Sequence, residues 1–147
     1  MAITTKIALI LTAILCVAST AQAQQSEIFG PYEFHYSVVN STFLAPEVAA
    51  TYGIIRGKKN AILTLAVREE AAPPGETLTM QLQGRTWDLI QNQTLEFLEI
   101  REGKAVYYIA QFKFINEEWR FFEVDFRPEG AQKTYTFKFK HQLYVDK

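Results

Sequence analysis

The sequence has few of the residues that build covalent cross-links or metal sites. It contains one cysteine, Cys16, and two histidines, His35 and His141. A disulfide needs two cysteines, and zinc or copper sites usually gather three or more nitrogen or sulfur ligands. The apolar run over residues 7–17 is shorter than the roughly 20 residues that a membrane-spanning helix needs. We therefore expect no disulfide, no metal site and no membrane span.

An excess of charge of either sign is also missing. Lys and Arg number 15 and Asp and Glu number 16, which gives a formal net charge of −1. A nucleic-acid-binding domain usually carries a basic surface, and attachment to anionic lipid by charge needs a polybasic cluster. The sequence has neither feature. We therefore expect no nucleic-acid partner and no electrostatic attachment to anionic lipid.

Residues 1–23 have the pattern of a cleaved export signal. A single lysine precedes the apolar run over residues 7–17, and residues 21–23 (Ala-Gln-Ala) form a small-x-small cleavage site. We expect cleavage after Ala23, with cleavage after Ala21 as the alternative. The mature part, residues 24–147, has the length of one ordinary domain and is large enough to bury a core without cross-links.

The mature part is rich in aromatic residues: it contains all 11 Phe, 7 Tyr and 2 Trp of the chain. Many of them alternate with polar residues, and this period of two predicts half-buried β-strands. The alternation predicts strands over residues 32–40, 61–69, 77–84, 94–101, 105–115, 119–127 and 135–143, with a short edge strand over 85–90.

Regularly spaced strands of this kind predict a single all-β domain over residues 24–147. We expect an immunoglobulin-like antiparallel β-sandwich of about seven strands. A small closed β-barrel is the alternative, because counting strands does not determine whether a sheet closes on itself.

Residues 44–53 depart from the β pattern and predict one short helix. Pro46 suits the first turn, Glu47 complements the positive end of the helix dipole, and Gly53 suits a left-handed exit. A helix of about two turns is stable only when it packs on other structure. We expect it to cap one end of the sandwich.

Two segments resemble a known family. Residues 29–36 (Phe-Gly-Pro-Tyr-Glu-Phe-His-Tyr) and 40–49 (Asn-Ser-Thr-Phe-Leu-Ala-Pro-Glu-Val-Ala) are similar to domain of unknown function 4426, an uncharacterised bacterial family. Residues 52–56, 101–110 and 143–146 extend the resemblance over nearly the whole mature chain. Its members are small exported proteins, so the resemblance implies a periplasmic location. It implies no activity, cofactor or catalytic residue.

The candidate site lies where the strand over residues 32–40 ends. Exported β-sandwiches usually act through loops held at one end of the sheets. The chain from the polar triplet Asn40-Ser41-Thr42 to Arg56 forms one such excursion. We predict that a ligand or partner binds a small polar site formed by His35, Asn40, Thr42, Tyr52 and Arg56. The alternative is that these residues only brace the connection.

The sequence favours a non-enzymatic binding or interaction module for a periplasmic or envelope protein, acting through this corner or through an edge strand. The rival is a small-ligand binder or hydrolase centred on His35, with Ser37 or Ser41 as nucleophile. However, the sequence contains neither Gly-x-Ser-x-Gly nor Ser-x-x-Lys. Glu96 and Glu99 point to opposite faces of their predicted strand, so they do not form a glycosidase pair there.

Four aromatic residues form a second candidate surface. Trp87, Trp119, Phe121 and Tyr107 lie opposite the predicted core faces or on an edge. If they are exposed, they mark a partner interface. The alternative is that the second sheet or another part of the chain covers them.

Overall fold

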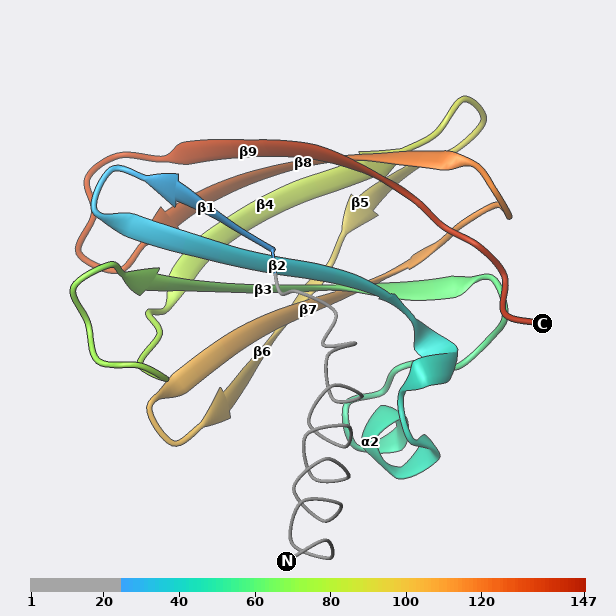
Figure 1. The fold of residues 1–147 in the computed structure, drawn as a ribbon, viewed down its shortest axis with the longest axis horizontal. Coiled ribbons are helices and arrows are strands. Elements are labelled where there is room, and N and C mark those ends of the chain that lie inside the picture. Colours follow the sequence, from blue (N-terminus) through green and yellow to red (C-terminus); the bar gives the residue numbers. More distant parts are fainter. Residues whose placement is uncertain (1–24) are drawn as a thin grey trace, which may run out of the picture.

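Two antiparallel sheets packed face to face form the structure, a computed structural model that describes residues 25–147 (Figure 1). The five-stranded sheet has the order β1 (Gln25–Phe29), β2 (Tyr32–Asn40), β3 (Asn60–Glu69), β7 (Ala105–Lys113), β6 (Phe97–Glu102). The four-stranded sheet has the order β5 (Asn92–Leu95), β4 (Met80–Trp87), β8 (Trp119–Pro128), β9 (Tyr135–Gln142). The predicted signal peptide, residues 1–23, lies outside the described residues.

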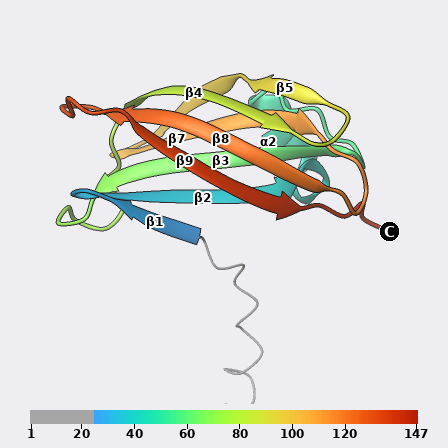
Figure 2. The same ribbon diagram turned by 90° about the horizontal axis from the view of Figure 1, so that it is seen from above.

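The predicted β-sandwich is confirmed, with nine strands in place of about seven. The strands of the two sheets run in nearly the same direction, as in an aligned sandwich (Figure 2). Within residues 25–147 the two sheets stay separate: β1 and β6 are the edges of one, and β5 and β9 are the edges of the other. The closed-barrel alternative is therefore wrong.

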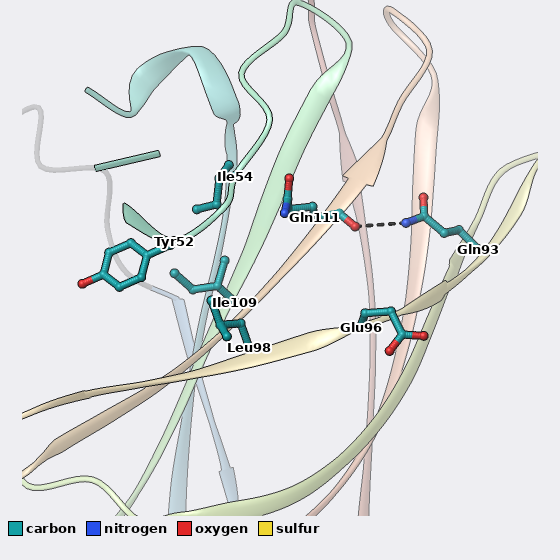
Figure 3. A pocket seen from close by; sticks show the side chains of 7 residues that line it. All are labelled: Tyr52, Ile54, Gln93, Glu96, Leu98, Ile109 and Gln111. Carbon is teal, nitrogen blue, oxygen red and sulfur yellow. Dashed lines mark hydrogen bonds between the residues drawn. The ribbon is translucent and has the colours of Figure 1, made fainter. Parts of the chain in front are cut away.

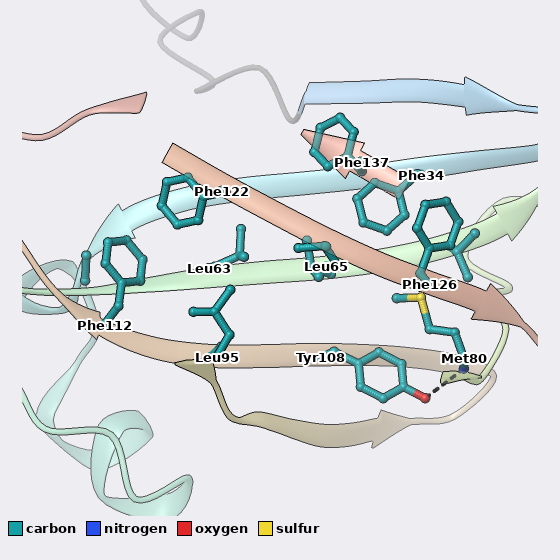
Figure 4. Packing of buried hydrophobic residues seen from close by; sticks show 14 of the residues in the cluster. Phe34, Leu63, Leu65, Met80, Leu95, Tyr108, Phe112, Phe122, Phe126 and Phe137 are labelled. Atoms are coloured by element: carbon teal, nitrogen blue, oxygen red, sulfur yellow. Dashed lines mark hydrogen bonds between the residues drawn. The ribbon is translucent and has the colours of Figure 1, made fainter. Parts of the chain in front are cut away.

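The core lies between the sheets and is built from the side chains that the alternation directs inward (Figure 4). Phe34 of one sheet stacks on Phe126 of the other, with ring centroids 4.4 Å apart. Phe137 packs against Phe34 at 5.0 Å, and all three rings are buried. Aromatic side chains bury large areas and gain further energy from ring–ring contacts. The strands therefore bury alternate side chains, as the period of two predicts.

The single strand predicted over residues 94–101 is wrong. The chain forms β5, passes Glu96, and continues as β6 in the other sheet. Leu95 and Phe97 both contact the core from their two sheets. A Cβ at Gly84 would lie 3.3 Å from Leu95 Cδ1 and 3.2 Å from Phe97 Cε2, so the glycine makes room for both. The alternation continues through the switch because the inner faces of both sheets line the same core.

Two other strand boundaries differ from the prediction. The short edge strand predicted over residues 85–90 is wrong, because residues 85–87 complete β4, which lies between β5 and β8. Strand β1 was not predicted, since its side chains are almost all exposed and show no core-facing row. It forms by pairing with β2 through a tight turn in which Gly30 has a φ of 58°.

The predicted short helix is confirmed as α2 (Pro46–Thr51), and a 3-10 turn, η1 (Ser41–Phe43), precedes it. Pro46 stands at its start and Gly53, after its end, has a φ of 66°. The helix lies at one end of the sandwich but over the outer face of the five-stranded sheet (Figure 1). There Ala49 and Ile54 pack against Ile62 in a small second cluster, separate from the main core.

We predict that Phe126→Ala lowers the free energy of unfolding by about 3–5 kcal/mol, because the cavity opens between both sheets. Urea denaturation followed by circular dichroism measures the change. Phe43→Ala is the matched control: Phe43 is 69% exposed, so its loss should change stability by no more than about 0.5 kcal/mol. Equal losses for the two variants would contradict the placement of the core.

Candidate functional site

One end of the sandwich collects α2 and the loops on which the sequence placed the candidate site (Figure 1). Strand pairing brings these loops together, because Asn60 pairs with Lys113 in one sheet and Trp119 pairs with Gln142 in the other. We call this the helix-bearing end and define it by four segments, residues 41–59, 88–91, 114–119 and 143–147.

Three of the five predicted site residues meet at this end. The Asn40 side-chain amide donates hydrogen bonds to the Tyr144 carbonyl at 2.7 Å and to Asp146 Oδ1 at 3.1 Å. The Thr42 hydroxyl donates to the other carboxylate oxygen of Asp146. The Arg56 guanidinium donates to the Thr42 carbonyl at 3.1 Å. Asn40 and Thr42 therefore fasten the C-terminal segment to the end of β2, and Arg56 ties Thr42 to the loop that follows α2.

His35 does not belong to this group. It precedes Asn40 by five residues on β2, which is about 17 Å along a strand, and its side chain lies on the opposite face. His35 Nε2 lies 3.4 Å from Glu33 Oε2, and the same oxygen lies 3.2 Å from Arg68 Nη1. The sequence placed His35 near Asn40 because they share a strand, but that strand runs away from the corner.

Tyr52 lies in a separate pocket of about 120 Å³ between α2 and the edge of the five-stranded sheet (Figure 3). The Gln93 amide donates to the Gln111 carbonyl at 3.0 Å, and the Gln111 amide donates to the Gly53 carbonyl at 3.1 Å. Small-molecule sites usually have volumes of about 300–1,000 Å³. This pocket is thus large enough for a side chain but too small for a typical organic ligand. Its lining residues are Tyr52, Ile54, Gln93, Glu96, Leu98, Ile109 and Gln111.

A second hollow, of about 210 Å³, lies beside Asn40 and contains His141 and Asp146, which the sequence did not place there. Burial lowers the pKa of His141, so the imidazole is neutral at neutral pH. The nearby Ser41 hydroxyl is buried; it donates to the Gly57 carbonyl at 3.2 Å and accepts from the Gly57 N–H at 3.0 Å. Because both of these bonds are to the backbone of Gly57, Ser41 is not free to act as a nucleophile beside His141.

The two histidines of the chain lie in different sheets, His35 on the outer face of β2 and His141 on β9. In the described part of the chain, no group of three or more His, Cys, Asp or Glu side chains is placed to hold a metal ion. Within residues 25–147, these side chains thus assemble no set of ligands of the kind that zinc and copper usually take.

A buried ion pair holds the turn between β4 and β5, which lies at the same end. Arg120 Nη1 is 2.7 Å from Asp88 Oδ2, and the two side chains are 2% and 3% exposed. Arg120 Nε also donates to the Thr86 hydroxyl at 2.9 Å. The other Asp88 oxygen accepts the backbone N–H groups of Ile90 and Gln91 at 2.8 and 2.7 Å.

The surroundings of Asp88 keep its carboxylate charged. Burial alone would raise the pKa of Asp88, but the Gln91 and Ile90 N–H groups and the Arg120 charge together hold that pKa below its ordinary value. Sequence reasoning missed the pair because its members are 32 residues apart and Arg120 falls in an inward row that is otherwise apolar. A charged residue in such a row is the one signal that the sequence offers.

Family membership follows from a match over most of the chain. The model of the domain of unknown function DUF4426 matches residues 26–146. The chain belongs to the DUF4426 family. A crystal structure of a DUF4426 family protein from Pseudomonas aeruginosa PAO1 is 30% identical to it, with a TM-score of 0.73 over 86% of this chain and 99% of that one. The predicted family is therefore confirmed.

Two structures of FetP from uropathogenic Escherichia coli strain F11 share the fold of this DUF4426 protein. A copper-bound variant is 11% identical, with a TM-score of 0.60 over 84% of this chain and 96% of that one. The as-isolated protein, expressed recombinantly in the periplasm, is 9% identical, with a TM-score of 0.60 over 85% and 96%. At these identities the likeness concerns the fold alone. No curated protein matches the chain.

No helix within residues 25–147 is long and apolar enough to cross a membrane.

We predict that Asn40→Ala loosens the C-terminal segment, because it removes the donor to the Tyr144 carbonyl and to Asp146 Oδ1 and leaves only the Thr42 hydroxyl on Asp146. The expected cost is about 1–3 kcal/mol of unfolding free energy. Hydrogen exchange should become faster at residues 143–146. Thr136→Ala, which removes an exposed side-chain bond to Asp125, should cost no more than about 0.5 kcal/mol. Unchanged exchange in Asn40→Ala would show that the corner does not depend on this amide.

We predict that Asp88→Ala lowers the unfolding free energy by about 3–5 kcal/mol, because it leaves the Arg120 charge buried and unpaired. Urea denaturation at neutral pH measures this. Lys104→Ala breaks an exposed pair with Glu76, and should cost about 1 kcal/mol or less.

The Asp88→Ala variant also tests how the free energy of unfolding depends on pH. Because the folded-state pKa of Asp88 is depressed, the contribution of Asp88 is complete above its unfolded pKa of about 3.9 and is lost as the pH falls through the folded value. The loss of stability below about pH 4 should therefore be shallower in Asp88→Ala than in the wild type. Parallel acid titrations would argue against a charged Asp88.

Proposed function

We propose that this protein is a non-enzymatic periplasmic interaction module that contacts a protein or another envelope component through its helix-bearing end. The distribution of exposed apolar side chains supports the proposal. Within residues 25–147, nine large hydrophobic side chains are exposed, and seven of them lie at the helix-bearing end: Phe43, Val48, Ile55, Leu89, Ile90, Trp119 and Tyr144. The other two, Ile28 and Leu98, lie on the edge strands β1 and β6.

This distribution is not a general property of the loops. The opposite end of the sandwich is also built from turns, between β1 and β2, β3 and β4, β6 and β7, and β8 and β9. None of the exposed large hydrophobic side chains of the described residues lies there. Single exposed hydrophobic residues are common on soluble proteins, whereas their concentration at one end supports an interaction surface there.

The polar contacts at this end support the same role by fixing the loops. Asn40 and Thr42 fasten the C-terminal segment, and Arg120 and Asp88 fasten the β4–β5 turn. A surface whose loops are ordered before binding loses less conformational entropy when a partner arrives. Asn40, Thr42 and Arg56 are then positioning residues for the surface.

The proposed compartment is the periplasm. The export signal predicted in residues 1–23 and the small exported proteins of the family support this location. FetP, which shares the fold, was expressed in the periplasm of Escherichia coli.

The rival, a hydrolase or small-ligand binder centred on His35, has weaker support. Ser37 follows His35 by two residues on the same face, about 7 Å along the strand. Ser41 is buried and bonded to Gly57. Copper binding, seen in the FetP variant, is not proposed for this chain, because its described residues assemble no group of three or more His, Cys, Asp or Glu side chains.

We predict that a photo-crosslinking amino acid at position 55 captures a partner in cells, whereas one at position 28 does not. Ile55 is 69% exposed at the helix-bearing end, and Ile28 is 53% exposed on β1, so access to solvent is similar. Mass spectrometry of the adducts identifies the partner.

A substitution pair completes the test. Phe43→Ser with Ile55→Ser should abolish capture by a crosslinker placed at Val48, and Ile28→Ser should leave that capture unchanged. Equal capture at positions 28 and 55, or none at 55, would overturn the proposed contact surface. Crosslinks between two copies of this chain would replace the partner with a homo-oligomer.

A further inference from the structure

The β4–β5 turn presents two aliphatic side chains to solvent on a rigid support. Leu89 is 93% exposed and Ile90 is 81% exposed. The turn is closed by a hydrogen bond from the Asp88 N–H to the Gln91 carbonyl at 2.9 Å, and the Asp88 carboxylate is buried against Arg120. Exposed aliphatic groups add nothing to folding stability, which comes from their burial. Folding stability therefore does not explain the exposure of this pair.

Aromatic side chains lie directly behind this tip on the outer face of the four-stranded sheet. Trp87 pairs with Phe121 across the strands, and their rings stack 5.8 Å apart at an angle of 18°. Trp119, 46% exposed, lies two residues nearer the tip on β8. Each step of two residues along a strand is about 7 Å. The tip is thus followed by an aromatic layer.

Two cations lie on this aromatic layer. The Arg85 guanidinium carbon lies 4.5 Å from the Trp87 ring centre, and Lys140 Nζ lies 4.8 Å from the Trp119 ring centre. Arg85 precedes Trp87 by two residues, and Lys140 pairs with Phe121, one step behind Trp119. With distance from the tip, the surface changes from aliphatic to aromatic to basic.

We infer that the β4–β5 turn inserts into the surface of a lipid bilayer. Leu89 and Ile90 reach the acyl boundary, Trp87 and Trp119 lie at the interface, and Arg85 and Lys140 face the lipid phosphates. Bilayers favour this order of aliphatic, tryptophan and basic side chains. The inference rests on the proposed function, because it names the bilayer as the envelope component that this part of the helix-bearing end contacts.

The arrangement favours lipid over two other occupants. A sugar would need open tryptophan faces, but Arg85 and Lys140 each lie over one of these rings. A pocket in a partner protein could accept the aliphatic pair, but it would give no reason for Lys140 over Trp119. Arg85 differs in that its Nε also lies 3.8 Å from Glu123 Oε1 in the same sheet. Phosphate groups at that depth supply the complementary charge.

Binding should be weak, reversible and driven by insertion. Even one buried acyl chain gives only marginal membrane attachment. Glu117 and Glu118 on the neighbouring β7–β8 turn are exposed and bring negative charge to the same end. We therefore expect little dependence on salt or on anionic lipid, in keeping with the absence of a polybasic cluster.

The two tryptophans of the chain, Trp87 and Trp119, both lie in the proposed contact, so intrinsic fluorescence reports on it directly. We expect the purified exported protein to show a blue shift with phosphatidylcholine vesicles and with phosphatidylethanolamine–phosphatidylglycerol vesicles. Brominated lipids should quench the emission, and vesicle flotation should recover a bound fraction at high and low salt. No shift and no flotation at saturating lipid would overturn the inference.

Variants of exposed residues separate insertion from adsorption. Leu89→Ser with Ile90→Ser should lower the vesicle-bound fraction by about tenfold or more. Ile28→Ser with Leu98→Ser, the control, should bind like the wild type. Undiminished binding of the tip variant, or binding that salt abolishes, would overturn insertion. If vesicles fail to bind while position 55 still captures a protein, the lipid inference fails and the proposed function stands.

Discussion

The packing of aromatic rings between the two sheets is the constraint on which the rest of the structure depends. Residues 25–147 contain no cysteine, so no disulfide ties the sheets together. Phe34, Phe126 and Phe137 connect them instead, in contacts of 4.4 and 5.0 Å between ring centres. This layer of buried aromatic side chains fixes which face of each sheet points inward. It thereby also fixes which loops meet at the helix-bearing end and how the outer faces meet solvent.

Most of the fold could be predicted because a period of two is visible in single strands. Strand β2 has its predicted bounds, Tyr32–Asn40, and α2 falls inside the predicted segment. The errors lie where the structure depends on sheet edges. The chain changes sheets at Glu96 without breaking the alternation, and β1 forms only because β2 offers an edge. A local pattern contains no information about either event.

The candidate site shows the same division. Asn40, Thr42 and Arg56 were predicted to meet, and they do so because all three lie on one short excursion. Asp146, the partner of Asn40 and Thr42, lies more than 100 residues further along the chain, and nothing in the local sequence indicates it. His35 and Tyr52 were grouped with them because they are near in sequence. In the fold, the direction of β2 takes His35 away from the corner, and the packing of α2 places Tyr52 in a separate pocket. The buried pair of Arg120 and Asp88 was missed for the same reason of separation.

The fastening of Asn40 and Thr42 by Asp146 has a consequence for the order of assembly. These contacts join residues that are more than 100 positions apart in the sequence. The strands between them can pair earlier, but the helix-bearing end acquires its final form only when Asp146 reaches Asn40 and Thr42. This end of the sandwich is therefore completed late in folding. A fusion attached at Lys147 would place foreign chain one residue after Asp146, whose hydrogen bonds to Asn40 and Thr42 hold this end together.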